Sequence, residues 1–243
     1  MRAGGAVLVT RPLPAAAETA ARLAARGYRP VIAPLLTILP KPEALPPPAT
    51  VQAVLVTSAH AVAHLPPAHR ALRLLAVGDA TAAHARRAGH AEVLSAAADA
   101  ARLAALAGET LDPGGPPLLL AVGEGQGTRL AAALRARGFH VLRRAVYTTA
   151  AAPVLPAAAR EALAARDGER SEGAGLSAAL FFSAETARVF RTLVEAEGLA
   201  GRLAPTAALA ISAATLAVLR PLPWRDVRQA SHPDQEALLA LLP

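Results

Sequence analysis

The sequence has no cysteine, a single lysine and few aromatic residues (four Phe, two Tyr and one Trp). Without cysteine, the chain cannot form disulfides, thiolate zinc sites or iron–sulfur clusters, and it has no cysteine nucleophile. It also lacks a long apolar run. The longest stretch without a charged residue or histidine, residues 203–219, is rich in alanine and too short to span a bilayer comfortably. Arg11 and Pro12 interrupt the apolar start of the chain, so we expect no signal peptide and a cytoplasmic protein.

Acidic residues are outnumbered by basic ones, 18 against 25, which gives a formal net charge of +7. Such a surplus favours an anionic partner. Proteins that bind nucleic acid usually cluster their basic residues and interleave them with stacking aromatics. Here the arginines are scattered and the aromatics lie mostly in apolar runs. We therefore expect a small polyanionic ligand rather than nucleic acid or a membrane.

The sequence also lacks the usual signatures of metal and nucleotide sites. His60 and His64 share a helical face, but no HExxH pattern accompanies them, so we expect no metal. The glycine run 123–127 has Thr128 where a dinucleotide fingerprint needs its last glycine. The only lysine, Lys41, follows Pro40, which excludes a P-loop. We expect no cofactor.

Short apolar runs alternate with alanine-rich segments of helical length along the whole chain. Runs of this kind that are followed by helices are typical of strands buried on both faces of a parallel sheet. The pattern therefore predicts an α/β protein. The predicted strands are residues 6–10, 53–57, 74–77, 118–122, 178–182 and 207–211.

Two kinds of unit each occur twice. Residues 6–36 and 118–147 share the order strand, turn, helix, Arg-Gly-aromatic and strand, and the glycine fits a helix C-cap. Residues 53–89 and 178–219 each contain two strands that end in small polar residues before a helix. The repeats predict two similar domains. Proline-rich residues 40–48 predict a stiff connector, and residues 166–175 predict a charged, mobile loop.

Small polar residues at the predicted strand-to-helix turns are the candidate ligand-binding groups. Ser58, Thr81, Ser183 and Thr215 are expected to cap or expose helix N-termini, where unpaired N–H groups attract anions. A plain N-cap that binds nothing is the alternative for each. Tyr147 is the last residue of the unit 118–147, and its position alone fits either a core residue or a functional one.

Short motifs also follow one another in a fixed order. They are Val9-Thr10-Arg11-Pro12, Pro34-Leu35-Leu36, Val56-Thr57-Ser58-Ala59, Val77-Gly78-Asp79-Ala80-Thr81-Ala82, Gly123 with Arg137-Gly138, Val146-Tyr147, Phe181-Phe182-Ser183, and Ala210-Ile211 ahead of Thr215. In order and spacing they resemble the uroporphyrinogen-III synthase family over nearly the whole chain. The chain departs from the family pattern at 211–216, where relatives have Ile-Gly-x-Thr-Thr-Ala, and His60 occupies a position that is often basic.

The resemblance implies two α/β lobes with parallel sheets flanked by helices, one inserted into the other. Lobe one would comprise residues 1–36 and 150–243, and lobe two residues 40–145. Residues 34–38 and 146–149 would form a two-stranded connector. We expect a monomer, because no exposed apolar stripe stands out in the sequence, and transient contact with the upstream deaminase of the pathway.

The resemblance further implies an enzyme that cyclises hydroxymethylbilane, a linear tetrapyrrole with eight carboxylates, with loss of water and inversion of ring D. Such a reaction needs positioning and stabilisation of a cationic azafulvene rather than a cofactor. Tyr147 is the predicted catalytic residue, because a phenol is protonated at neutral pH and can donate to the departing water. The predicted substrate-binding residues are Thr10, Arg11, Ser58, His60, Gly78, Thr81, Gly123, Ser183, Ser212 and Thr215.

Two other functions stay open at this point. A two-lobed protein that binds an anionic metabolite without reacting it would tolerate changes at Tyr147. A nucleotide-dependent oxidoreductase would bind a nicotinamide cofactor, although the glycine fingerprint is incomplete.

Overall fold

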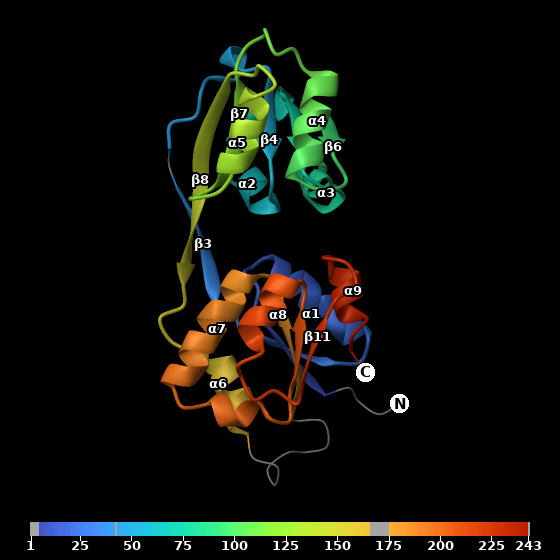
Figure 1. Ribbon diagram of the computed structural model, residues 1–243, viewed down its shortest axis with the longest axis vertical. Coiled ribbons are helices and arrows are strands. Elements are labelled where there is room, and N and C mark those ends of the chain that lie inside the picture. The colour runs from blue at the N-terminus through green and yellow to red at the C-terminus, as the bar shows by residue number, and fades with distance from the viewer. Residues whose placement is uncertain (1–4, 42, 166–174, 243) are drawn as a thin grey trace. The chain divides into compact units, whose positions relative to one another are not determined.

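The computed structural model describes residues 5–41, 43–165 and 175–242. These residues form two α/β units, each with its own mainly parallel sheet (Figure 1). Unit 1 consists of residues 1–37 and 150–243, and unit 2 of residues 38–149. The fold class predicted from the alternating pattern is confirmed.

The sheet of unit 1 has five strands in the order β11-β10-β9-β1-β2, and every neighbouring pair is parallel. Apolar side chains fill both of its faces, as the uninterrupted apolar runs predict. Its elements are β1 (Ala6–Val9), α1 (Ala15–Ala25), β2 (Arg29–Ile32), α6 (Ala157–Ala164), β9 (Leu176–Phe181), α7 (Ala184–Ala196), β10 (Ala207–Ala210), α8 (Ala213–Leu219), β11 (Asp226–Gln229) and α9 (Gln235–Leu239).

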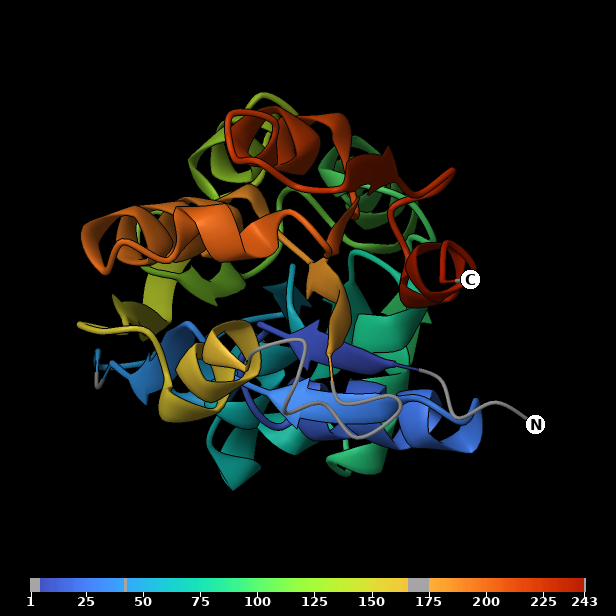
Figure 2. The same cartoon turned by 90° about the horizontal axis from the view of Figure 1, so that it is seen from below.

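The helices of unit 1 cover the two faces of this sheet separately. On one face, residues of α6, α7 and α8 pack around Phe181, Phe190 and Trp224. On the other, residues of α1 and α9 pack on Val7 and Val9. Figure 2 shows α6 (yellow) and α7 (orange) on the opposite side from α9 (red). Both faces of the central strands are therefore excluded from water.

The sheet of unit 2 has six strands in the order β3-β8-β7-β4-β5-β6. Residues of α4 and α5 cover one face, and residues of α2 and α3 cover the other. The elements are β3 (Leu36–Pro40), β4 (Ala53–Val56), α2 (Ala59–Ala63), β5 (Arg73–Ala76), α3 (Asp79–Arg87), β6 (Val93–Ser95), α4 (Ala100–Thr110), β7 (Leu118–Gly123), α5 (Thr128–Arg135) and β8 (Val141–Ala151).

The chain passes between the two units in β3 and β8, which lie next to each other in the sheet order. Their hydrogen-bond partners run in opposite directions along the chain: Ala152 N–H donates to Leu35 O at 2.9 Å, and Lys41 N–H donates to Val146 O at 3.0 Å. Both entry and exit of the inserted unit therefore run through one antiparallel pair of strands.

All six predicted strands are confirmed, within one or two residues at their ends. The edge strands β6 and β11 were not predicted, because Val93–Ser95 is too short and Asp226–Gln229 too polar to stand out. Short 3₁₀ turns also connect elements, among them Pro67–Ala71. The predicted loop 166–175 and Pro42 of the connector lie outside the described residues, except for Gly175. Every helix in the described part of the chain is too short or too polar to cross a membrane.

Candidate active site

The strand order of unit 2 reverses between β4 and β7. From β4 the chain moves outward to β5 and β6, whereas from β7 it moves the other way to β8. Ligands of open parallel sheets bind outside the carboxyl ends of the strands at such a reversal, because the two connections diverge there. Ser58 follows β4, and Gly123 ends β7. The topology alone therefore places these two predicted residues at the favoured end of the sheet.

Tyr147 comes from the neighbouring strand β8 and lies over Gly123. It pairs with Gly123 in the β7–β8 ladder, and Glu124 N–H donates to its carbonyl at 2.9 Å. A Cβ atom on Gly123 would lie 2.7 Å from Cζ and 2.9 Å from Oη of Tyr147. The glycine is thus required because the phenol occupies the space of a side chain. Tyr147 is only 3% exposed.

The hydroxyl of Tyr147 lies near two polar groups without a short bond to either. Its oxygen is 3.3 Å from Ser58 Oγ and 3.4 Å from Gln126 Oε1. Both distances are long for hydroxyl bonds, which usually measure about 2.7–2.8 Å. A substrate oxygen at normal distance would compete well for this donor.

His60 of α2 and His64, the C-cap of that helix, pack against the same phenol. The His60 ring meets it edge-on with centroids 5.8 Å apart, and the His64 centroid lies 6.0 Å away. His64 is held by its Nδ1, 2.7 Å from His60 O, and Ser58 caps α2 by accepting from His60 N–H at 3.0 Å. One short helix therefore positions a hydroxyl and two imidazoles beside Tyr147.

Two hollows in unit 2 reach this cluster. One, of about 450 Å³, is lined by Thr57, Ala100 and residues 125–130, and it includes Gln126. The other, of about 410 Å³, is lined by prolines of residues 40–48 and by His64 and Val146. Each hollow is lined by one residue that contacts Tyr147, Gln126 in the first and His64 in the second, whereas Tyr147 itself lines neither.

An ion pair supports the strand that carries Tyr147. The Lys41 ammonium pairs with Glu124, and hydrogen bonds from Lys41 and then Thr148 lower the pKa of that carboxyl. The main chains of the same two residues bond β8, Lys41 N–H to Val146 O and Glu124 N–H to Tyr147 O. Glu124 therefore faces Lys41 and contributes to placing β8.

Unit 1 has a similar reversal, between β1 and β9. Arg11 follows β1, and its guanidinium carbon lies 4.2 Å from the ring centroid of Phe182, which follows β9. Arg11 Nη1 donates to Gln235 Oε1 at 2.8 Å and to Thr19 Oγ1 at 3.3 Å. Burial lowers the pKa of the guanidinium, and the charge of Glu18 opposes that shift. A half-buried cation therefore lies at this edge of the sheet.

Two serine caps adjoin that edge of unit 1. Ser183 accepts from Thr186 N–H at 3.1 Å and caps α7, while Ser212 accepts from Thr215 N–H at 3.3 Å and caps α8. Each serine hydroxyl is also paired with the threonine hydroxyl three residues on, at 2.8 and 3.0 Å. These hydroxyls are largely used within the turn, which leaves main-chain N–H groups of the first helical turn for a ligand.

For two of the four expected caps the prediction is wrong. Gly78, not Thr81, occupies the N-cap of α3, and Ser212, not Thr215, occupies that of α8. Both threonines lie inside the first helical turn and are buried, because the strand ends earlier than the sequence pattern suggests. Thr10 is also fully buried and donates to Leu180 O at 2.7 Å, so its hydroxyl ties β1 to β9.

Four polar residues of these clusters were not predicted from the sequence. Gln126 and His64 contact Tyr147, Thr186 pairs with Ser183, and Gln235 holds Arg11. Of these, only Thr186 had a visible signal, since Ser183-Ala-Glu-Thr186 has the same spacing as Ser212-Ala-Ala-Thr215. Among the described residues, no group of three or more His, Asp or Glu side chains is placed to hold a metal ion.

Comparison with known proteins identifies the family. The family model described as "Uroporphyrinogen-III synthase HemD" matches residues 17–240. The crystal structure of uroporphyrinogen-III synthetase from Helicobacter pylori is similar in fold, with a TM-score of 0.63 at 19% identity, over 98% of this chain and 97% of that one. A mutant uroporphyrinogen III synthase from the extremely thermophilic bacterium Thermus thermophilus matches with a TM-score of 0.48 at 21% identity, over 98% and 96%. No curated protein matches the chain.

Proposed function

Since the chain belongs to the HemD family of uroporphyrinogen-III synthases, we propose that Tyr147 is its catalytic proton donor. The chain is an enzyme of porphyrin biosynthesis that cyclises hydroxymethylbilane to uroporphyrinogen III with loss of water. The observation that carries the proposal is the position of the phenol over Gly123, with its hydroxyl 3.3–3.4 Å from Ser58 and Gln126.

The reaction requires the enzyme to position the substrate and to transfer one proton. As the C–O bond of the hydroxymethyl group breaks, the Tyr147 hydroxyl gives its proton to the leaving oxygen, and water departs from a cationic azafulvene. The substituted α-carbon of ring D then attacks the azafulvene and forms a spiro intermediate. The bond from that carbon to the methylene between rings C and D breaks, which leaves a second azafulvene on ring C. The free α-carbon of ring D bonds to that methylene and loses its proton to the phenolate, so that ring D is inverted. Atoms and charge balance without a cofactor. The Ser58 hydroxyl can donate to the transient phenolate, whereas Gln126 presents its amide oxygen and accepts from the neutral phenol.

The remaining predicted residues are proposed to bind the carboxylates of the substrate. Main-chain N–H groups at the strand-to-helix turns and the Arg11 guanidinium are suited to carboxylates, and the net charge of +7 agrees with a polyanionic substrate. His60 and Gly123 contact or adjoin Tyr147. The proposed set is Thr10, Arg11, Ser58, His60, Gly78, Thr81, Gly123, Ser183, Ser212 and Thr215, with Thr10, Thr81 and Thr215 acting through the main chain.

The proposal also covers the organisation of the enzyme. The two compact units support a discontinuous lobe of residues 1–36 and 150–243 with residues 40–145 inserted as a second lobe. A monomer is supported by the small number of exposed large apolar side chains among the described residues, which are Leu13, Ile32, Leu39 and Val154. Hydroxymethylbilane closes by itself to the unreversed isomer, which favours direct contact with the upstream deaminase. A cytoplasmic location stays a prediction.

The test is a coupled assay. The upstream deaminase generates hydroxymethylbilane, the protein is added, the products are oxidised, and the porphyrin isomers are separated. We expect predominantly isomer III from the parent protein. Tyr147→Phe is expected to lower kcat at least roughly tenfold with a loss of stability within about 1 kcal/mol, because the bonds of the hydroxyl are long.

Tyr28→Phe is the matched control, since Tyr28 is the only other tyrosine and belongs to unit 1, whereas Tyr147 belongs to unit 2. Its activity should equal that of the parent protein. Near-normal turnover by Tyr147→Phe would remove the phenol from the mechanism. Isomer I at the level of the blank from the parent protein would contradict the activity itself.

A further inference from the structure

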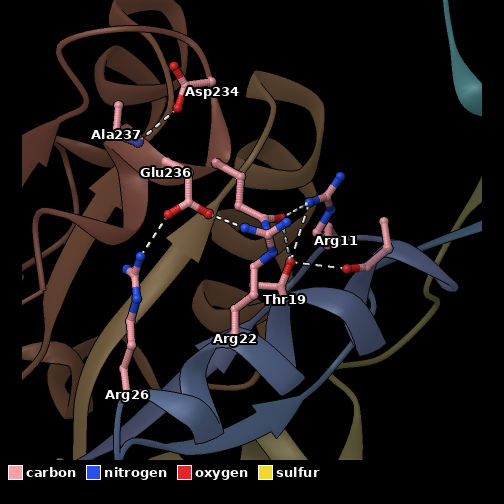
Figure 3. A network of polar contacts seen from close by, with 9 residues as sticks. Arg11, Thr19, Arg22, Arg26, Asp234, Glu236 and Ala237 are labelled. Atoms are coloured by element: carbon pink, nitrogen blue, oxygen red, sulfur yellow. Dashed lines mark hydrogen bonds and ion pairs between the residues drawn. The ribbon is translucent and has the colours of Figure 1, made fainter. Parts of the chain in front are cut away.

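The C-terminal helix α9 is tied to α1 by a polar network that ends at Arg11 (Figure 3). Leu238 and Leu239 of α9 are buried on the same face of the sheet as α1. Asp234 caps α9 by accepting from Ala237 N–H at 2.8 Å. The helix is thus fixed at its start, where the next two residues, Gln235 and Glu236, face the arginines of the N-terminal segment.

Glu236 forms ion pairs with two arginines, Arg22 of α1 and Arg26 at its C-cap. Its Oε2 lies 2.7 Å from Arg26 Nη2, and its Oε1 pairs with Arg22. All three side chains are exposed, so these pairs contribute modestly to stability. Arg22 and Arg26 are therefore paired with a carboxylate, as exposed arginines often are.

Gln235, the residue before Glu236, binds Arg11 through a neutral amide rather than a carboxylate. Its Oε1 accepts from Arg11 Nη1 at 2.8 Å, and Thr19 Oγ1 lies 3.0 Å from the same oxygen. Thr19 Oγ1 is also 3.0 Å from Ala15 O, so its one hydrogen can serve either acceptor. Within the described residues, no carboxylate forms an ion pair with Arg11, although this guanidinium is more buried than that of Arg22 or Arg26.

A half-buried cation held by neutral groups keeps its charge for a ligand. Phe182 stacks against one face of the guanidinium, and Gln235 and Thr19 both engage Nη1. Together they fix its plane without forming an ion pair, because an amide oxygen and a hydroxyl carry no net charge. The charge of Glu18 also acts on the guanidinium, but the two side chains form no ion pair in the described structure. A carboxylate at position 235 would form the ion pair internally and compete with an incoming carboxylate.

We propose that Gln235 is a positioning residue for substrate binding: it orients Arg11 toward a substrate carboxylate while leaving the charge of Arg11 unpaired. This inference rests on the proposed role of Arg11 in binding the substrate. The choice of amide over carboxylate, one residue before a glutamate that pairs with two arginines, is the feature that sets the substrate affinity.

The decisive variant is Gln235→Glu, which keeps the shape of the side chain and adds one charge. We expect its melting temperature to equal or exceed that of the parent protein, because a partly buried ion pair forms. We expect its KM for hydroxymethylbilane to rise roughly fivefold or more, with kcat within about twofold of the parent value. Higher stability with weaker binding is a combination that a merely structural role of Gln235 does not produce.

Glu236→Gln is the matched control on the same helix. It breaks the pairs with Arg22 and Arg26 and should leave KM unchanged. Arg11→Gln removes the guanidinium itself and therefore tests the role of Arg11 separately from that of Gln235. A raised KM for both Arg11→Gln and Gln235→Glu supports the proposal.

Two results would overturn it. If Arg11→Gln raises KM and Gln235→Glu does not, Arg11 binds substrate but Gln235 does not govern it. If Arg11→Gln leaves KM unchanged while the fold is intact by circular dichroism, the role of Arg11 fails and the inference about Gln235 fails with it. Isomer III formed by the parent protein in the same assay keeps either result distinct from a failure of the enzymatic activity.

Discussion

Among single residues, Gly123 decides where the Tyr147 hydroxyl can lie. A Cβ added there would meet Tyr147 Cζ at 2.7 Å, closer than real Cβ atoms approach, and Gly123 ends a buried central strand that cannot easily shift. Gly123→Ala should therefore displace the phenol. We expect kcat to fall at least roughly tenfold, as for Tyr147→Phe, and the free energy of unfolding to fall by about 1–3 kcal/mol. The isomer assay and urea unfolding measure the two effects.

Gly108→Ala is the matched control for this substitution. Gly108 lies within α4 of the same unit, and the nearest atom to its added Cβ is Arg137 Cδ at 3.9 Å. Alanine inside a helix should raise stability by about 0.5–1 kcal/mol and leave turnover unchanged. Parent-like turnover in Gly123→Ala would show that catalysis does not depend on the observed position of the phenol.

A second residue-scale prediction concerns acid sensitivity. His90 is buried, and its Nδ1 has no hydrogen-bond partner among the described residues. Burial, and then the charges of Arg70 and His69, lower the pKa of His90 from its ordinary value of 6.5. The unfolded chain therefore binds a proton at a higher pH than the native protein does, so stability is lost as the pH falls below about 6.5. His90→Gln should flatten this part of the profile in urea unfolding series, and an unchanged slope would contradict the assignment.

At the scale of elements, the sequence predicted what depends on local pattern. The six central strands were predicted because apolar runs buried on both faces need no knowledge of their neighbours. The serine caps Ser58 and Ser183 followed from their place between strand and helix. Thr81 and Thr215 were misplaced by a few residues, because a threonine inside the first turn has the same composition signal as one that caps it.

Contacts between residues far apart in the sequence could not be predicted from local sequence patterns. Gln126 lies 21 residues from Tyr147 in sequence, and Gln235 lies 224 residues from Arg11. No periodic sequence pattern indicates either contact, because each depends on which strands become neighbours and on where a helix packs. The β4/β7 and β1/β9 reversals that bring the candidate residues together are likewise properties of strand order.

At the scale of the whole molecule, unit 2 has the attributes of an inserted domain that folds alone. It is one continuous segment, 38–149, with its own six-stranded sheet and its own apolar clusters on the two faces. Its ends enter and leave through the paired strands β3 and β8, so cutting there removes few hydrogen bonds. We expect residues 38–149, expressed alone, to unfold cooperatively in urea.

The isolated segment also carries a marker of correct folding. Because His90 and both of its charged neighbours belong to unit 2, the loss of stability below about pH 6.5 should persist in the segment and disappear in its His90→Gln variant. The segment should form no isomer III, since Arg11 and the Ser183 and Ser212 turns belong to unit 1. If the segment shows no cooperative transition, β3 and β8 need residues outside 38–149 to form the edge of the sheet. The insertion would then be a topological division of the chain rather than an independent folding unit.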